Sequence, residues 1–361
     1  MRKGWEYKKL GEVCEVVTGT TPKTNIPEYW GKGHYWVTPA ELNDTTVYID
    51  KTERQITDEA LSKTKLRLLP VGTVLLSSRA PIGKVAIANA EMYCNQGFKN
   101  CICSEAIYNK YLFYFLRLKK DYLNSLGRGA TFKEISKSIV ESIKIPLPPK
   151  STQLAIVSEL DKINELIRLK KEQLKDFDNL AQSLFYEMFG DPVENEKGWE
   201  VKKLGEICEI FAGGDKPKDM CEIQNNEYIY PVIANGEGEK GILGYTKNCR
   251  VTKEAVTIGA RGASIGNCRI VKNGFTPAIR LLTLIPTGSI DCCFLYYFVK
   301  DLNYKQNGAG QAQLTVPNIK CEFIPLPPLS LQRLFAQRIE QIEREKSEVQ
   351  KSIQDLETLL A

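Results

Sequence analysis

The side chains best suited to chemistry in this sequence are basic, amide and hydroxyl residues in short glycine-containing loops. In the first half these are Thr20, Thr21 and Lys23 in GTTPK, Arg79 and Lys84 in SSRAPIGK, Gln96 and Lys99 in NQGFK, and Arg128, Thr131 and Lys133 in GRGATFK. In the second half they are Lys216 and Lys218 in GGDKPK, Arg261, Asn267 and Arg269 in ARGASIGNCR, and Gln311 and Gln313 in GAGQAQ. Arginine and lysine donate hydrogen bonds to guanine, glutamine and asparagine pair with adenine, and lysine neutralises phosphate. Glycine lets the backbone come close to phosphates. The pattern is typical of contact with DNA.

Taken singly, each of these residues is better interpreted as an ordinary solvated loop residue. Arg79 and Arg261 stand apart, because each precedes an Ile-Gly pair in a similar segment, TVLLSSRAPIGKVAI and AVTIGARGASIGNCRI. A role for this arginine in an internal ion pair is equally consistent with the pattern.

Residues that would make the chain an enzyme are missing from the sequence. Ile82-Gly83-Lys84 lacks the upstream glycine of a nucleotide-binding loop. No Asn-Pro-Pro-aromatic segment, the signature of adenine methyltransferases, occurs. His34 is the single histidine, which leaves little scope for acid–base catalysis or a Cys/His zinc site. The 11 cysteines form no C-x-x-C pair, so we interpret them as reduced core residues. We expect no cofactor and no metal.

The composition is that of an ordinary soluble globular protein, and the N-terminal sequence predicts a cytoplasmic location. Hydrophobic residues make up 43% and charged residues 26%, which suits a chain with packed cores. No apolar run reaches the roughly 20 residues that cross a bilayer, and the N-terminus lacks the apolar centre of a signal peptide. The net charge of +5 is compatible with nucleic acid.

The loops belong to a unit that occurs twice. KGWEYKKLGEVCEV from Lys3 matches KGWEVKKLGEICEI from Lys197 at 11 of 14 positions. IPLPPKSTQ from Ile145 matches IPLPPLSLQ from Ile324 at 7 of 9. Each copy mixes short strands with one helix and frequent Gly and Pro, which predicts an α/β (α+β) domain. In the first copy the predicted strands include 73–77 and 85–88, and the predicted helix covers 107–120. Two similar modules suit a target in two parts.

A long amphipathic helix is predicted after each module, because apolar residues recur there at steps of three and four. The first stripe is Ile156, Leu160, Ile163, Ile167, Leu174, Phe177, Ala181, Leu184 and Met188; the second is Phe335, Ile339, Ile342, Val349, Ile353, Leu356 and Leu360. Such spacing over several heptads is typical of a coiled coil. Lys170 and Lys346 interrupt the stripes, where either a register-setting role or snorkelling to solvent would fit.

Four segments follow from these patterns. They are a first recognition module over 1–150, a central helix over 151–192, a second module over 193–329 and a C-terminal helix over 330–361. Ser151 and Ser330 are candidate N-caps, and Gly190 ends the first helix. We expect the two helices to pair antiparallel and hold the modules apart.

In these features the chain resembles the specificity subunits of type I restriction–modification systems. The motifs are the opening WExKKLGE, the IPLPP segment with a following glutamine before each helix, and FYEMFGDP over 185–192. The resemblance covers essentially the whole chain. It implies two DNA target-recognition domains, each reading half of a bipartite asymmetric site on double-stranded DNA. It also implies that the helices set the half-site spacing and dock methyltransferase subunits, two in number, which a restriction or translocase subunit can join.

The sequence analysis therefore predicts a non-catalytic DNA-recognition subunit. Two alternatives are a two-headed coiled-coil adaptor for protein partners, and a self-contained methyltransferase or nuclease, which the missing motifs disfavour. Because the modules differ between their shared motifs, we expect two different half-sites.

Overall fold

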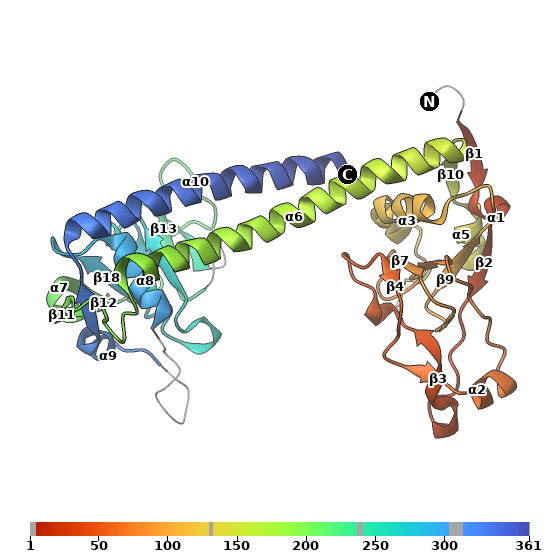
Figure 1. Cartoon of the computed structure of the whole chain (residues 1–361), viewed down its shortest axis with the longest axis horizontal. Helices are drawn as coiled ribbons and strands as arrows, with labels where there is room; N and C mark the ends of the chain where they lie inside the picture. Colours follow the sequence, from red (N-terminus) through yellow and green to blue (C-terminus); the bar gives the residue numbers. More distant parts are fainter. Residues whose placement is uncertain (1–4, 130–132, 237–240, 303–312, 361) are drawn as a thin grey trace. The chain divides into compact units, whose positions relative to one another are not determined.

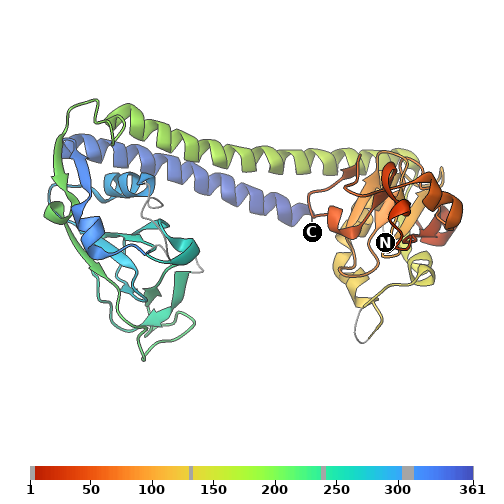
Figure 2. The same cartoon turned by 90° about the horizontal axis from the view of Figure 1, so that it is seen from below.

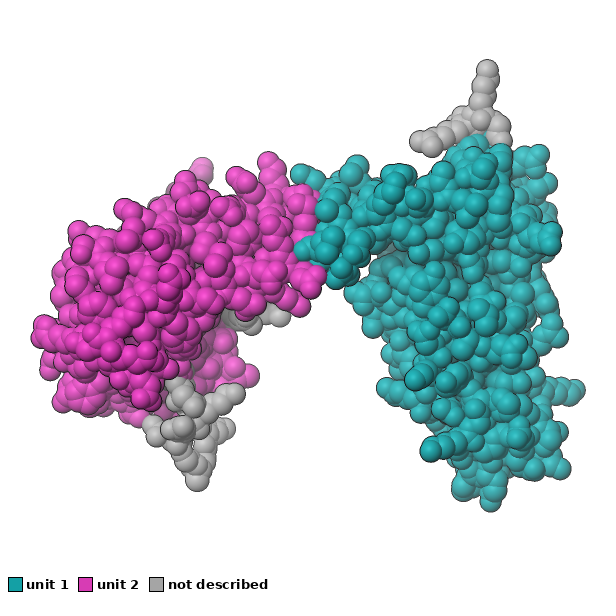
Figure 3. Space-filling model, in the orientation of Figure 1, with its two compact units in different colours: residues 1–169, 354–361 teal, residues 170–353 magenta. Residues whose placement is uncertain are grey.

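Two compact units make up the chain. The computed structural model describes residues 5–129, 133–236, 241–302 and 313–360. One unit comprises Met1–Leu169 with Gln354–Ala361, and the other comprises Lys170–Ile353 (Figure 3). Each unit thus holds one module together with the helical segments next to it. Among the described residues, no helix is long and apolar enough to cross a membrane.

The first module is built on a five-stranded sheet in the order β2-β9-β6-β7-β4, with a three-stranded sheet β5-β3-β8 and a ribbon β1-β10 beside it (Figure 1). The strands are β1 (Glu6–Lys9), β2 (Cys14–Thr18), β3 (Trp30–Val37), β4 (Tyr48–Ile49), β5 (Gln55–Ile56), β6 (Val74–Leu76), β7 (Val85–Ala88), β8 (Tyr93–Cys94), β9 (Lys99–Cys103) and β10 (Lys144–Leu147). The helices are α1 (Leu10–Val13), η1 (Pro27–Tyr29), η2 (Pro39–Glu41), α2 (Asp58–Lys63), α3 (Asn109–Leu118), α4 (Lys120–Ser125) and α5 (Lys137–Ser142).

Helix α3 covers one face of this sheet. Leu112, Phe113 and Leu116 are fully buried in a core that also contains Val74 and Ile87 of β6 and β7. Burial of side chains of this size stabilises the domain by about 1.5–3 kcal/mol each. The apolar runs predicted as strands at 73–77 and 85–88 form β6 and β7, and the helix predicted over 107–120 forms α3.

The second module repeats this framework with a four-stranded sheet β12-β18-β15-β16, a sheet β14-β13-β17 and a ribbon β11-β19. Its strands are β11 (Glu200–Lys203), β12 (Cys208–Ala212), β13 (Tyr230–Ile233), β14 (Ile242–Thr246), β15 (Ala255–Ile258), β16 (Cys268–Val271), β17 (Thr276–Pro277), β18 (Leu282–Pro286) and β19 (Phe323–Leu326). Its helices are α7 (Leu204–Ile207), η4 (Gly262–Ser264), α8 (Cys292–Asp301) and α9 (Val316–Cys321).

The strand registers of the two modules correspond residue by residue. Cys14 pairs with Cys103 between β2 and β9, and Cys208 pairs with Pro286 between β12 and β18. Parallel pairs also match, since β3 lies beside β8 as β13 lies beside β17. The predicted duplication of an α/β unit is therefore confirmed.

A buried glutamine joins each module to its long helix. In the first copy, Gln153 Oε1 accepts a hydrogen bond from Tyr108 N at 2.8 Å, and its Nε2 donates to the carbonyls of Ala106 and Pro148. In the second, Gln332 Oε1 accepts from Asp291 N at 2.8 Å, and Nε2 donates to Pro327 O at 2.7 Å. Both side chains are fully buried, so each amide satisfies main-chain groups that water cannot reach.

Replacing this amide should therefore destabilise the module. We expect Gln332→Leu to lower the free energy of unfolding by about 1–3 kcal/mol, because Asp291 N and Pro327 O lose their partner while remaining buried. Gln337→Leu, on the exposed face of the same helix, is the matched control and should change little. Equal urea midpoints for the two variants would show that the Gln332 side chain does not stabilise the module.

The two long helices are α6 (Lys150–Phe189) and α10 (Leu329–Leu360), of 40 and 32 residues. Both begin directly after a Pro-Pro pair, so Ser151 and Ser330 lie in the first turn; their prediction as N-caps was wrong. The carbonyl of the second proline accepts the first helical hydrogen bond, from Gln153 N at 3.1 Å in α6 and from Gln332 N at 3.2 Å in α10, which explains the earlier start.

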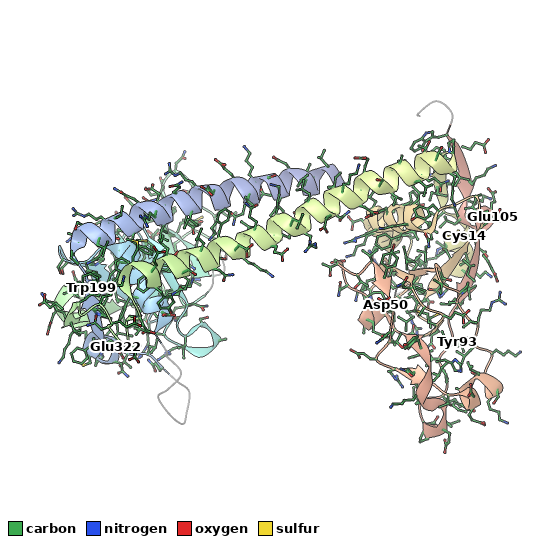
Figure 4. All side chains as sticks on the ribbon, in the orientation of Figure 1. Cys14, Asp50, Tyr93, Glu105, Trp199 and Glu322 are labelled. Carbon is green, nitrogen blue, oxygen red and sulfur yellow. The ribbon has the colours of Figure 1, made fainter. Side chains whose placement is uncertain are left out.

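Helix α6 ends at Gly190, as predicted. Gly190 has φ +78°, a left-handed conformation that glycine adopts without strain. Lys197 Nζ donates to the carbonyl of Glu187, and Trp199 Nε1 donates to the carbonyl of Phe189 at 2.9 Å, which caps the last turn (Figure 4).

Within the second unit the helices run antiparallel and side by side (Figure 2). Phe335 lies against Phe185 with ring centroids 5.7 Å apart, and Lys346, further along α10, pairs with Asp178, which is earlier on α6. All the described residues of the two predicted stripes are buried or half-buried. The predicted stripe differs from the structure at its start, because Ile156 and Leu160 pack against the core of the first module.

Lys346 bridges the two helices. Its Nζ lies 2.8 Å from Asp178 Oδ1 and 2.9 Å from Glu343 Oε1, and its side chain is 17% exposed. Partial burial alone would lower the pKa of Lys346, but the hydrogen bonds to both carboxylates raise the pKa above its usual value. This contact favours the register-setting role over snorkelling.

Candidate nucleic-acid interface

In the first module, the loop after β6 and the loop before α5 are joined at Glu134. The main chain of Glu134 pairs with Arg128 through two hydrogen bonds of 2.9 and 3.0 Å and forms a bridge with Arg79. Ile135 N donates to Ser78 O at 3.0 Å, which fixes the same contact. Two predicted arginines, Arg79 and Arg128, therefore both pair with Glu134 through the main chain.

Lys99 also lies at the junction around Glu134, but its side chain is buried. Its Nζ donates to Glu134 Oε1 at 2.9 Å and to Ser78 Oγ at 3.2 Å, and its side chain is 6% exposed. A buried ammonium needs such a partner, so Lys99 stabilises the loop, and its contact with DNA stays a prediction. Lys84 is half-buried and donates to Pro39 O at 3.0 Å, so its ammonium is also engaged within the module.

The second module has the same junction with different side chains. Arg261 and Gln313 form a main-chain bridge, and Leu314 N donates to Ala260 O at 3.0 Å, as Ile135 N does in the first copy. Arg261 Nη2 donates to Gln313 Oε1 at 3.3 Å, and both residues are exposed. An exposed Arg–Gln pair thus replaces the carboxylate of the first module.

Arg269 is held more tightly than its exposed neighbour Asn267. Its Nη2 donates to Gly236 O at 3.2 Å, and burial lowers the pKa of its guanidinium. The loop with Lys216 and Lys218 begins at Gly213, where a Cβ would come within 2.7 Å of Ala278 N. The glycine there lets two loops pack main chain against main chain.

The exposure of the remaining candidates divides them into two groups. Those that are exposed are Lys23, Gln96, Arg128, Lys133, Lys216, Lys218, Arg261, Asn267 and Gln313. Those that are half-buried are Thr20, Thr21, Arg79, Lys84 and Arg269. Thr131 and Gln311 lie outside the described residues.

One exposed cation, Arg280, was missed. It follows β17 at the position that Gly97 occupies in the first module, as the matched strand registers show. The sequences alone do not align the loop around Gly97 with the loop around Arg280, because the two loops share no motif. Predicting both strands around each loop would have aligned them.

The comparison with known proteins identifies the family. The family model described as the type I restriction modification DNA specificity domain matches the chain twice, over residues 2–176 and 196–358. The chain belongs to this family. The two matches correspond to the two modules, each with its long helix.

Curated relatives agree with this assignment. The chain is 32% identical to the Type I restriction enzyme MjaIX specificity subunit of Methanocaldococcus jannaschii, over 92% of this chain and 85% of the relative. It is 26% identical to the Type I restriction enzyme EcoprrI specificity subunit of Escherichia coli, over 87% of this chain and 82% of the relative.

Solved structures share the fold. One, from a study of complex assembly and conformational transition in the type I R-M system, covers 100% of this chain and 96% of its own, with a TM-score of 0.71 and 22% identity. The S subunit from M. genitalium covers 99% and 94%, with a TM-score of 0.57 and 16% identity.

The chain is therefore a DNA specificity subunit, and not the catalytic component of its system. Five of the cysteines are buried as the predicted core role requires, five are half-buried, and Cys321 is exposed. Burial raises the pKa of the Cys208 thiol to about 12. A thiol with such a pKa stays protonated at neutral pH and is a poor metal ligand. In the described part of the chain, no group of His, Cys, Asp and Glu side chains is arranged to hold a metal ion.

Proposed function

We propose that each module of this specificity subunit reads one half of a bipartite, asymmetric site on double-stranded DNA. The observation that carries the proposal is that both modules share one arrangement of strands and helices but carry different side chains at the same loop junction. Glu134 with buried Lys99 occupies the loop junction of the first module, and Gln313 with exposed Arg261 occupies that of the second. A carboxylate accepts hydrogen bonds, whereas arginine and glutamine donate to guanine and pair with adenine, so the two junctions suit different bases.

The helices are the proposed ruler and docking site. Helix α6 is continuous from one unit into the other, and Lys346 with Asp178 fixes its register against α10. Leu166, Leu169 and Leu180 on α6 are 42–52% exposed, although side chains of this type are usually buried. These exposed leucines support docking of methyltransferase subunits on the helices. Because the chain is an internal repeat, we propose that two such subunits dock and that a restriction subunit can join them. Acting on cellular DNA, the complex would be cytoplasmic.

Exchange of one module tests the reading of half-sites. Replacing residues 1–150 with the corresponding module of another specificity subunit should change one half-site and leave the other and the spacer unchanged. The reason is that the two cores share no residue, so exchange of one module leaves the core of the other intact. Methylome sequencing of a host that carries the variant and its methyltransferase subunit measures the result. The reciprocal control exchanges 193–329 and should change the other half-site. If either exchange altered both half-sites, the proposal would fail.

The adaptor alternative predicts a different outcome. A protein-binding scaffold would support methylation at the same sequences whichever module it carried, because recognition would lie elsewhere in the complex.

A further inference from the structure

Two consecutive residues between β17 and β18 have a strained main chain. Ile279 has φ +49° and Arg280 has φ +58°, in the left-handed region that glycine and asparagine favour. For a β-branched side chain such as isoleucine this conformation is a clear outlier. Strain of this kind persists only where the surroundings hold it in place, and it gathers at functional sites.

Hydrogen bonds from two other segments hold this turn, and one of them is bonded in turn to a third. Ile279 N donates to Gly214 O at 2.7 Å, and Arg280 N donates to Gly213 O at 3.1 Å. Asn235 Nδ2 donates to Ile279 O at 2.6 Å, while Asn235 Oδ1 accepts from Ala260 N at 2.8 Å. The turn is thus fixed to the loop that begins the GGDKPK segment and to the residue that precedes Arg261.

The side chains of the turn contribute little to the core. Ile279 is 45% exposed, so its burial does not account for an isoleucine at a left-handed position. Arg280 is exposed, and no acceptor in the described part of the chain pairs with its guanidinium. An apolar group and an exposed cation are therefore presented together on a turn that Asn235 connects to the residue before Arg261.

The corresponding turn of the first module is held by different hydrogen bonds and carries different side chains. The matched positions are Gln96 and Gly97, where Asn95 Oδ1 accepts from Gly97 N at 2.8 Å and Ser78 N donates to Gly97 O at 2.7 Å. Gln96 is exposed. An amide in one copy thus takes the place of an isoleucine and an arginine in the other.

We propose that Ile279 and Arg280 are specificity-determining residues that contact base edges in the half-site of the second module. Arg280 donates to the acceptors of a guanine, and Ile279 packs against a neighbouring apolar edge such as the methyl group of thymine. The proposal rests on the proposed function, since it needs the second module to read DNA.

The test uses the full chain in complex with its methyltransferase subunit. The probe is a duplex that contains the site defined by methylome sequencing, compared with a duplex of unrelated sequence. Arg280→Ala should weaken binding to the specific duplex by about tenfold or more, and relax the preference at one position of one half-site. Binding to the unrelated duplex should change far less.

Ile279→Asn separates recognition from folding. Asparagine tolerates the left-handed conformation, so the melting temperature should stay the same or rise while specific binding weakens. Lys253→Ala, at the opposite end of β15 from Arg261, removes the same charge and is the control. It should leave the recognised sequence unchanged.

Three results would overturn the assignment. Unchanged specific binding in both variants would do so, as would an equal loss for Arg280→Ala on both duplexes, which indicates a phosphate contact. A melting temperature lowered by Ile279→Asn would make Ile279 structural. In each case the module exchange would still move a half-site if the proposed function holds. Failure of that function would instead appear as a site unaffected by any exchange.

Discussion

Phe185→Ala is expected to remove about 3–5 kcal/mol from the stability of the second unit. Phe185 is 1% exposed and lies where α6, α8 and α10 meet. Its ring centroid is 5.6 Å from that of Phe294 on α8 and 5.7 Å from that of Phe335 on α10. Removing the ring leaves a cavity among side chains that three elements hold in place, so little relaxation can fill it.

Calorimetry of the intact chain measures this loss. The transition of the second unit should fall by roughly 10 °C, and that of the first should hold, because its core shares no residue with the cluster around Phe185. Leu180→Ala on the same helix is the control, since Leu180 is 52% exposed. A loss below 1 kcal/mol, or an equal shift of both transitions, would show that Phe185 does not join the helices to the module.

Local patterns in the sequence predicted the parts of the fold that depend on local physics. The apolar run at 85–88 became β7 with the same limits, and the steps of three and four became the buried stripes of α6 and α10. The strongest helix-packing residues, Phe185 and Phe189, were placed in a family motif but not in a stripe. They face α8 as well as α10, and a heptad pattern describes contact with one partner only.

The loop residues were harder to assign because their environment depends on pairings distant in sequence. Lys99 and Lys23 are both lysines in short polar loops of the sequence. Lys23 is exposed, whereas Lys99 is buried against Glu134, which is 35 residues away. Arg280 was missed for the same reason, since only the pairing of β12 with β18 places it beside the GGDKPK loop. The glutamine after each IPLPP segment was noted as part of a repeat, but its three partners come from residues before the helix.

Inserting four residues after Leu174 should lengthen the spacer between the half-sites and leave both half-site sequences unchanged. The insertion adds about 6 Å by helix rise, close to two base-pair steps of ~3.4 Å. It rotates the preceding part of α6 by little more than one turn, so the apolar stripe nearly keeps its direction. The contacts of Lys346 with Asp178 and of Phe335 with Phe185 lie beyond the insertion and are preserved.

Inserting two residues at the same place is the contrasting variant. It turns the preceding stripe by roughly 200°, away from α10, because each residue contributes about 100°. Ile163 and Ile167 would then face solvent, so we expect weaker folding or a loss of methyltransferase docking with no defined spacer. Methylome sequencing of both variants decides the matter. A spacer unchanged by the four-residue insertion would mean that α6 does not set the distance between half-sites, whereas a spacer longer by about two base pairs would establish the helix as the ruler of the site.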